Sequence, residues 1–217
     1  MLTVLDLLPI FPLPNVVLFP NVSLPLHIFE TRYREMVADV LKHDRLIGMV
    51  LLRPGWQQDY EGRPPVYPVG CSGVITHVEQ LGDGRYNIVL RGVERFRILE
   101  EDDRLSDRRA RIERLPEAPC RAEDTHAIRT VRAKLDALLA PALERRVADV
   151  ASEAKIPEAM PDEDLVHALA QYLDLDPLEK QALLELRGLR ARAESLVELL
   201  EMKILIAKTP GISNVAH

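Results

Sequence analysis

The sequence predicts an α+β fold, with a β pseudo-barrel in the N-terminal half and an α-helical bundle in the C-terminal half. Prolines interrupt short apolar runs throughout residues 9–25. Proline fixes φ and lacks a backbone donor, so such runs form short extended segments near edges and turns. After residue 117, apolar residues instead recur at helical spacing. We therefore expect a β domain at residues 1–117 and a helical domain at residues 118–217.

The middle of the β half contains a buried strand and a hairpin. Residues 46–52 are a continuous apolar run of strand length. Residues 73–81 and 85–91 flank the turn Gly82-Asp83-Gly84, and Asp-Gly between β-rich runs predicts a hairpin.

Two further strands are expected before the boundary. Gly92 predicts a kink, followed by a strand through Phe96 and Ile98, and residues 110–115 predict the last strand. Many short strands with proline and glycine corners indicate a small barrel or pseudo-barrel.

One helix is expected within the β half, shortly after residue 30. Apolar residues recur there at i, i+3, i+4, i+7 and i+8, which defines one buried face. Thr31 is the expected N-cap. The apolar face consists of Tyr33, Met36, Val37, Val40 and Leu41.

The C-terminal half predicts three helices. The first begins near residue 123, and Pro141 is expected to end or kink it. Asp162 is the expected N-cap of a short second helix.

The third helix has the strongest start signal. Asp176-Pro177 with Glu179 supplies an N-cap, a proline at N1 and a carboxylate at N3. We expect this helix to reach about Lys208, because Gly188 costs only about 1 kcal/mol relative to alanine. Residues 212–217 are expected to be a disordered tail.

Composition is that of an ordinary globular protein, with 47% hydrophobic and 29% charged residues. The net charge is −6, and both halves are acidic, which argues against binding to a phosphate backbone. No apolar run approaches the roughly 20 residues that cross a bilayer, and no signal peptide is recognisable. Cys71 and Cys120 fit a reducing compartment. We expect a cytoplasmic protein.

Motifs for common enzyme chemistry are missing from the sequence. It contains no G-x-x-x-x-G-K-[ST], H-E-x-x-H or C-x-x-C, and its six histidines are scattered. Ser152-Glu153-Ala154-Lys155 matches S-x-x-K, but no S-D-N accompanies it, so we interpret it as a chance match. We therefore predict no catalytic residue, no cofactor and no metal.

A long polar loop at residues 53–68 is the remaining candidate for function. It contains Trp56, the only tryptophan, together with Tyr60 and Tyr67. Loops of this length are uncommon in compact domains. The aromatic residues are interpreted either as a binding surface or, for Trp56, as a cap on the barrel.

Two long segments resemble a known family. FPLPNVVLFPNVSLPLHIFETRYREMV (residues 11–37) and PVYPVGCSGVITHVEQLGDGRYNIVLRGVERFRI (residues 65–98) resemble the N-terminal domain of Lon-type ATP-dependent proteases. The matching elements occur in the family's order and cover residues 7–116 clearly and the helical half more loosely.

The resemblance implies a PUA-like β fold followed by a helical bundle. It also implies that this region engages substrate polypeptide and helps to assemble the protease ring. This sequence contains neither the ATPase module nor the Ser-Lys protease domain, so it resembles the stand-alone Lon substrate-binding-domain proteins of bacteria. A peptidase activity is therefore not expected.

The leading functional hypothesis is a non-enzymatic polypeptide-binding or adaptor module in protein quality control. Its partner would be unfolded or damaged polypeptide, or a specific protein, with no membrane partner; homo-oligomerisation is left open. The expected contact residues are Tyr33, Met36, Trp56 and Tyr60.

Two alternatives belong to other functional classes. An RNA-binding PUA-like protein would need a basic groove built from Arg91, Arg95, Arg97 and Arg109. A small-molecule-binding protein or enzyme would use the polar cluster Glu30, Arg32 and Arg34, although Glu30 and Arg34 are spaced to pair on a helix.

Overall fold

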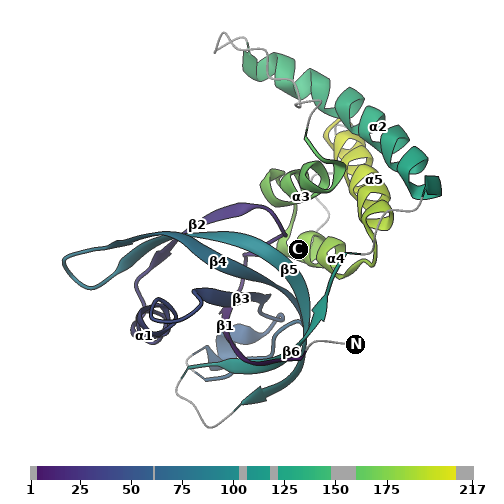
Figure 1. The fold of residues 1–217 in the computed structure, drawn as a ribbon. Helices are drawn as coiled ribbons and strands as arrows, with labels where there is room; N and C mark the ends of the chain where they lie inside the picture. The colour runs from purple at the N-terminus through teal and green to yellow at the C-terminus, as the bar shows by residue number, and fades with distance from the viewer. Residues whose placement is uncertain (1–3, 61, 103–106, 118–121, 148–159, 209–217) are drawn as a thin grey trace. The chain divides into compact units, whose positions relative to one another are not determined.

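The computed structural model describes residues 4–60, 62–102, 107–117, 122–147 and 160–208 (Figure 1). The β-strands are β1 (Val4–Leu13), β2 (Ser23–Ile28), β3 (Leu46–Leu51), β4 (Val69–Gln80), β5 (Tyr86–Asp102) and β6 (Arg109–Leu115). The α-helices are α1 (Thr31–Val40), α2 (Ala122–Val147), α3 (Asp162–Tyr172), α4 (Pro177–Glu185) and α5 (Leu189–Lys208), and a 3₁₀-helix spans Trp56–Asp59.

The six strands form one sheet that closes on itself. Their order is β2-β5-β4-β3-β1-β6, and β5 pairs in addition with β6. β5, β4, β3, β1 and β6 therefore form a ring, as the curled strands in Figure 1 show. The β1–β3 pair is parallel, and the other pairs are antiparallel. The predicted α+β fold with a β pseudo-barrel is confirmed.

β5 makes closure possible because it is 17 residues long and serves two partners along one edge. Its first part, Tyr86 to Arg91, pairs with β2, and its second part, Arg95 to Asp102, pairs with β6. Gly92 lies between the two parts. A Cβ at this position would collide with the carbonyl oxygen of Phe19, so only glycine fits.

The predicted separate strand after Gly92 is wrong, because β5 continues through this residue. In place of the predicted kink at Gly92, the pairing of β5 with β4 shifts its register here. Ser72 pairs with Glu94 while Gly73 pairs with Gly92, which leaves Val93 as the extra residue of a bulge.

The two faces of β1 bury different side chains. Ile10 lies in the barrel core with Val50 and Phe96, whereas the ring of Phe11 contacts Tyr33 of α1 at a centroid distance of 4.3 Å. The predicted apolar face of α1 is confirmed for Tyr33, Met36, Val37 and Val40, which are all buried. The expected N-cap was wrong, because α1 already begins at Thr31 and Glu30 occupies the cap position.

The start of α4 agrees with its predicted capping box. The backbone N–H of Leu178 donates to Oδ1 of Asp176 at 2.9 Å, and the N–H of Asp176 donates to Oε2 of Glu179 at 2.7 Å. The predicted continuous helix to Lys208 is wrong. Gly188 adopts a left-handed conformation with φ of 84°, which separates α4 from α5.

Contacts divide the chain into two compact units. The first comprises Met1–Glu117 and His167–Glu185, and the second comprises Ala118–Val166 and Leu186–His217. The predicted domains at 1–117 and 118–217 stay a prediction.

Hydrogen bonds join the helical segment of the first unit to its strands. The Gln181 side chain donates to the carbonyl oxygen of Val69 at 3.0 Å, and Arg95 donates to the carbonyl oxygen of Leu184 at 3.0 Å. The backbone N–H of Phe19 donates to Gln171 at 3.2 Å.

In the second unit, α2 packs against α5, and ion pairs Lys134–Glu201 and Arg190–Asp124 join them. α2 does not end at Pro141 but continues to Val147. The predicted tail at residues 212–217 lies outside the described residues. Within the described part of the chain, no helix is both long and apolar enough to cross a membrane.

Candidate functional site

Three adjacent hollows follow the length of α1 in the first unit. The first has a volume of about 240 Å³ and shares Arg32, Met36 and Asp107 with the second, which has a volume of about 680 Å³. The second shares Asp39 and Arg109 with the third, of about 170 Å³. We refer to the three hollows together as the α1 groove.

The first hollow combines an apolar wall with several guanidinium groups. Four segments that are distant in the sequence build it: β1, α1, Leu52 together with the loop at residues 53–68, and the residues just before β6. Its apolar and aromatic wall consists of Ile10, Pro12, Tyr33, Met36, Leu52, Tyr60 and Pro64. Its charged residues are Arg32, Arg63, Asp107 and Arg108.

Arg32 is held between two tyrosine rings. Its guanidinium carbon lies 4.7 Å from the centroid of Tyr33 and 4.9 Å from that of Tyr60, which are cation–π distances. Arg32 also pairs with Glu30 at 3.0 Å and donates to the carbonyl oxygen of Tyr60 at 3.1 Å. These contacts hold one guanidinium in a defined plane at the wall of the groove.

Tyr60 connects the loop to α1. Its hydroxyl donates to Oε1 of Glu30 at 2.6 Å, and its ring packs edge-on against Trp56 at a centroid distance of 5.4 Å. Both aromatic side chains are partly exposed. The loop therefore presents a pair of rings that is supported from the helix side.

Burial changes the acidity of both tyrosines. It raises the pKa of Tyr33 to about 12. The pKa of Tyr60 is also raised, first by burial and then by its hydrogen bond to Glu30, because a carboxylate acceptor stabilises the protonated phenol. Both groups are neutral phenols at physiological pH.

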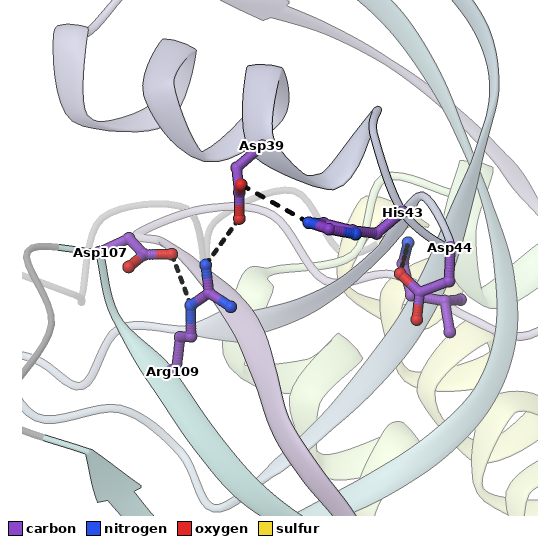
Figure 2. Close-up of polar contacts among 6 residues, drawn as sticks. Asp39, His43, Asp44, Asp107 and Arg109 are labelled. Atoms are coloured by element: carbon purple, nitrogen blue, oxygen red, sulfur yellow. Dashed lines mark hydrogen bonds and ion pairs between the residues drawn. The ribbon is translucent and has the colours of Figure 1, made fainter.

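A cluster of charged residues lines the second and third hollows, and Figure 2 shows the polar contacts within this cluster. The Arg109 guanidinium donates to Asp39 at 2.8 Å and to Asp107 at 2.8 Å. Asp39 also faces His43 at 3.8 Å. The hydrogen bond from Arg109 holds the pKa of the Asp39 carboxyl below its usual value. Asp39 is thus an ionised acceptor, unlike the protonated carboxyl that a general acid requires.

Two nitrogens of the Arg108 guanidinium donate hydrogen bonds, and the third has no acceptor among the described residues. Its Nε and Nη2 donate to the carboxylate of Glu101 at 2.7 and 3.0 Å. Its Nη1 atom is covered and has no hydrogen-bond acceptor among the residues that the structure describes. A buried donor left unpaired typically costs about 1–3 kcal/mol.

The α1 groove provides several kinds of contact for a bound molecule. It offers apolar contact area, aromatic rings and guanidinium donors in one groove. In the described ranges, no group of three or more histidine, cysteine, aspartate or glutamate residues is placed to hold a metal ion.

Residues 7–202 match the family of the ATP-dependent protease La (LON) substrate-binding domain. The chain belongs to this family.

Relatives include full-length Lon proteases. Lon protease 2 of Myxococcus xanthus is 28% identical over 209 residues, which cover 94% of this chain and 24% of the relative. Lon protease of Anaeromyxobacter dehalogenans is 29% identical over 207 residues, which cover 93% and 24%. The chain therefore spans about a quarter of the length of the curated relatives that it matches.

Two solved structures share the fold of this Lon substrate-binding domain. The N-terminal domain of a Mycobacterium avium complex Lon protease has a TM-score of 0.65 at 17% identity, covering 90% of this chain and 98% of that one. A Lon N-terminal domain protein from Xanthomonas campestris has a TM-score of 0.57 at 21% identity, covering 95% and 100%.

The α1 groove brings together three of the four predicted contact residues of this Lon domain. Tyr33, Met36 and Tyr60 line the first hollow, and Trp56 touches Tyr60. Tyr33 and Met36 are only 7% and 2% exposed, so they form the floor of the groove and pack into the core at the same time. Their role in binding stays a prediction.

The residues Glu30, Arg32 and Arg34, predicted as one polar cluster, make contacts in two different places. Glu30 pairs with Arg32 and Tyr60, while Arg34 donates to the carbonyl oxygen of Gly84 at 2.8 Å and so supports the β4–β5 hairpin. Spacing along a helix suggested a Glu30–Arg34 pair. The helix begins only at Thr31, which frees Glu30 to face the loop.

Sequence reasoning missed Arg63, Asp107 and Arg108. They belong to no motif, and they reach the groove only because β6 closes the barrel beside β1 and the long loop lies over α1. The S-x-x-K match at residues 152–155 lies outside the described residues.

Proposed function

We propose that this Lon substrate-binding domain is a non-enzymatic module that binds unfolded or damaged polypeptide, or a specific protein partner, in the α1 groove. The observation that supports the proposal most directly is the continuous line of hollows along α1. An extended chain segment needs such a groove, with apolar floor and polar rim, more than it needs a closed cavity.

The aromatic residues supply contact area at a low entropic cost. Trp56 and Tyr60 are partly exposed and support each other, and Tyr60 is anchored through Glu30. Rigid aromatic side chains are common anchors in binding interfaces. The first hollow, with a volume of about 240 Å³, has room for a peptide side chain.

Three of the four arginines that an RNA-binding groove would need are paired with carboxylates. Arg95 faces Glu117 at 3.5 Å and is 5% exposed, Arg97 faces Glu113 at 3.5 Å, and Arg109 is paired with Asp39 and Asp107. Paired guanidinium groups contribute little to phosphate binding, since the partner carboxylates repel the phosphates.

Fluorescence of Trp56 tests the proposal, because it is the only tryptophan of the chain. We expect a saturable spectral shift during titration with a reduced, permanently unfolded protein. Tyr60→Ala should weaken the apparent affinity, because it removes the ring against Trp56 and the bond to Glu30.

Tyr172→Ala is the matched control. Tyr172 is a 67% exposed tyrosine on α3 that also makes one hydrogen bond, to the carbonyl oxygen of Ser23. It lies outside the three hollows, so its loss should leave the titration unchanged. Absence of binding by fluorescence and by co-sedimentation would rule out the proposed function.

A further inference from the structure

The first hollow of the α1 groove has a chemical preference that its apolar wall does not explain. Three guanidinium groups line it, from Arg32, Arg63 and Arg108; Arg32 is paired with Glu30 and Arg108 with Glu101, and the lining also includes the carboxylate of Asp107. The carboxylate is itself held by Arg109 at 2.8 Å. Arg32 and Arg63 already donate to Glu30 and to the carbonyl oxygen of Asp102, so the donor that a neutral apolar peptide would leave facing hydrocarbon is Nη1 of Arg108.

Arg108 supplies the specific feature. The side chain is 10% exposed, and Glu101 occupies its Nε and Nη2 atoms. This side-on pairing directs Nη1 away from Glu101, and Nη1 has no acceptor within the described residues. A charged donor that is buried without an acceptor gains from any oxygen that reaches it.

The neighbouring hollow has the opposite character. Its lining includes Glu30, Glu35, Asp39 and Asp107 against Arg32 and Arg109. An anionic group is therefore repelled from the middle of the groove and accepted at its first hollow. This difference gives the groove a polarity along α1.

From these observations we propose that the first hollow accepts a carboxylate of the bound polypeptide, through Nη1 of Arg108, beside an apolar side chain that packs on Tyr33 and Met36. The inference rests on the proposed polypeptide-binding function and specifies its ligand chemistry. The Nη1 atom is covered in the unbound structure, so the carboxylate reaches it after a rotamer change of the hollow's wall, an adjustment that is common on binding.

Two sources can supply this carboxylate, the C-terminus of a chain or an aspartate or glutamate side chain. Three versions of one short apolar peptide ending in phenylalanine distinguish them. The first has a free C-terminal carboxylate, the second a C-terminal amide, and the third the amide with glutamate as the penultimate residue. Isothermal titration calorimetry with the whole chain measures each affinity.

We expect the free acid, the glutamate peptide or both to bind on the order of tenfold more tightly than the plain amide. Arg108→Lys keeps a cation for Glu101 but loses the direction of Nη1, and it should reduce the preference to about one while the amide affinity stays the same. The double variant Arg108→Gln/Glu101→Gln removes both charges together and should have the same effect.

Arg111→Gln is the matched control, because Arg111 lies in β6, is 52% exposed and pairs with Glu100 outside the groove. It should keep the full preference. Equal binding of acids and amide to the wild-type chain, or an unchanged preference in both Arg108 variants, would overturn the inference and leave polypeptide binding intact. Failure of all three peptides and of the unfolded protein to bind would overturn both.

Discussion

The phenol of Tyr60 donates a 2.6 Å hydrogen bond to Oε1 of Glu30, and this bond fixes the loop at residues 53–68 to the residue that precedes α1. Glu30 also holds Arg32, which lies between the rings of Tyr33 and Tyr60. The walls of the first hollow are therefore coupled, although they come from distant parts of the sequence.

Removing the Tyr60 hydroxyl should loosen this coupling. Tyr60→Phe keeps the ring against Trp56 but loses the bond to Glu30. We expect a loss of about 1 kcal/mol in the free energy of unfolding, measured by urea denaturation. Tyr67→Phe, in the same loop, is the control and should change little. A Tyr60→Phe variant as stable as the wild type would contradict the coupling.

Tyr33 should make the protein sensitive to alkali. Its pKa is raised from 10.0 to about 12, so the folded state keeps a proton that the unfolded state releases. The resulting stabilisation is complete below pH 10 and is lost as the pH rises from 10 to 12. It amounts to roughly 2–3 kcal/mol.

The Tyr33→Phe variant isolates this contribution. It should lack the alkaline loss, so the difference in unfolding free energy between wild type and variant should change with pH only above 10. Ultraviolet absorbance of tyrosinate measures the ionisation directly. A wild type and variant with parallel stability profiles from pH 9 to 12 would contradict the assigned pKa.

Asp39 should contribute to stability at neutral pH and lose that contribution in acid. Its pKa lies below the ordinary 3.8, because Arg109 donates a hydrogen bond to the carboxylate. The contribution is therefore present above pH 3.8 and disappears as the pH falls through the lower folded value. The side chain is 39% exposed, so solvent screening limits the effect to about 0.5–1 kcal/mol.

Asp39→Asn should accordingly lower the free energy of unfolding at pH 7 and match the wild type near pH 2. Denaturant titrations at the two pH values measure the difference. Added salt should reduce the gap at pH 7. A gap of equal size at both pH values would show that the pair with Arg109 does not cause it.

Closure of the barrel should depend on Gly92. In Gly92→Ala the new methyl group meets the backbone of Phe19 and Pro20, which cannot move aside as a side chain would. We expect a loss of at least about 2 kcal/mol in thermal or urea unfolding. Gly82→Ala is the matched control, because a Cβ there meets no atom within 4 Å. Equal stability of the two variants would refute this packing argument.

Gln181 should hold α4 on the sheet. Its side chain is 2% exposed and donates to the carbonyl oxygen of Val69 at 3.0 Å and to Glu185 at 2.8 Å. Gln181→Met removes both bonds at similar volume and should cost about 1–3 kcal/mol of unfolding free energy. Ala182→Met, at an exposed position of the same helix, should be nearly neutral.

Local signals in the sequence predicted the elements well wherever the physics is local. The hairpin around Asp83-Gly84, the apolar face of α1 and the capping box at Asp176 each depend on residues within a few positions of one another. Their geometry is decided by φ, by spacing along a helix and by short-range hydrogen bonds.

Errors occurred where distant residues decide the outcome. Gly92 did not end a strand, because β6 extends the pairing of β5 beyond it. A different error occurred at Gly188, where the left-handed conformation of this glycine separates two helices that propensity alone would have joined. Tyr33 and Met36 looked equally suited to a core and to a binding face, and the fold gives them a place at the floor of a groove that is also part of the core.

The sequence by itself determined the family, the α+β class and the position of several elements, because hydrophobic period, turn residues and family motifs depend on residues that are near one another in the sequence. Only the tertiary structure decided that the barrel closes through the β5–β6 pair and that Glu30, Tyr60 and Arg108 meet around one hollow. The reason is that strand pairing and loop packing bring together side chains that are far apart in the sequence. No local pattern in the sequence indicates that such side chains will be in contact.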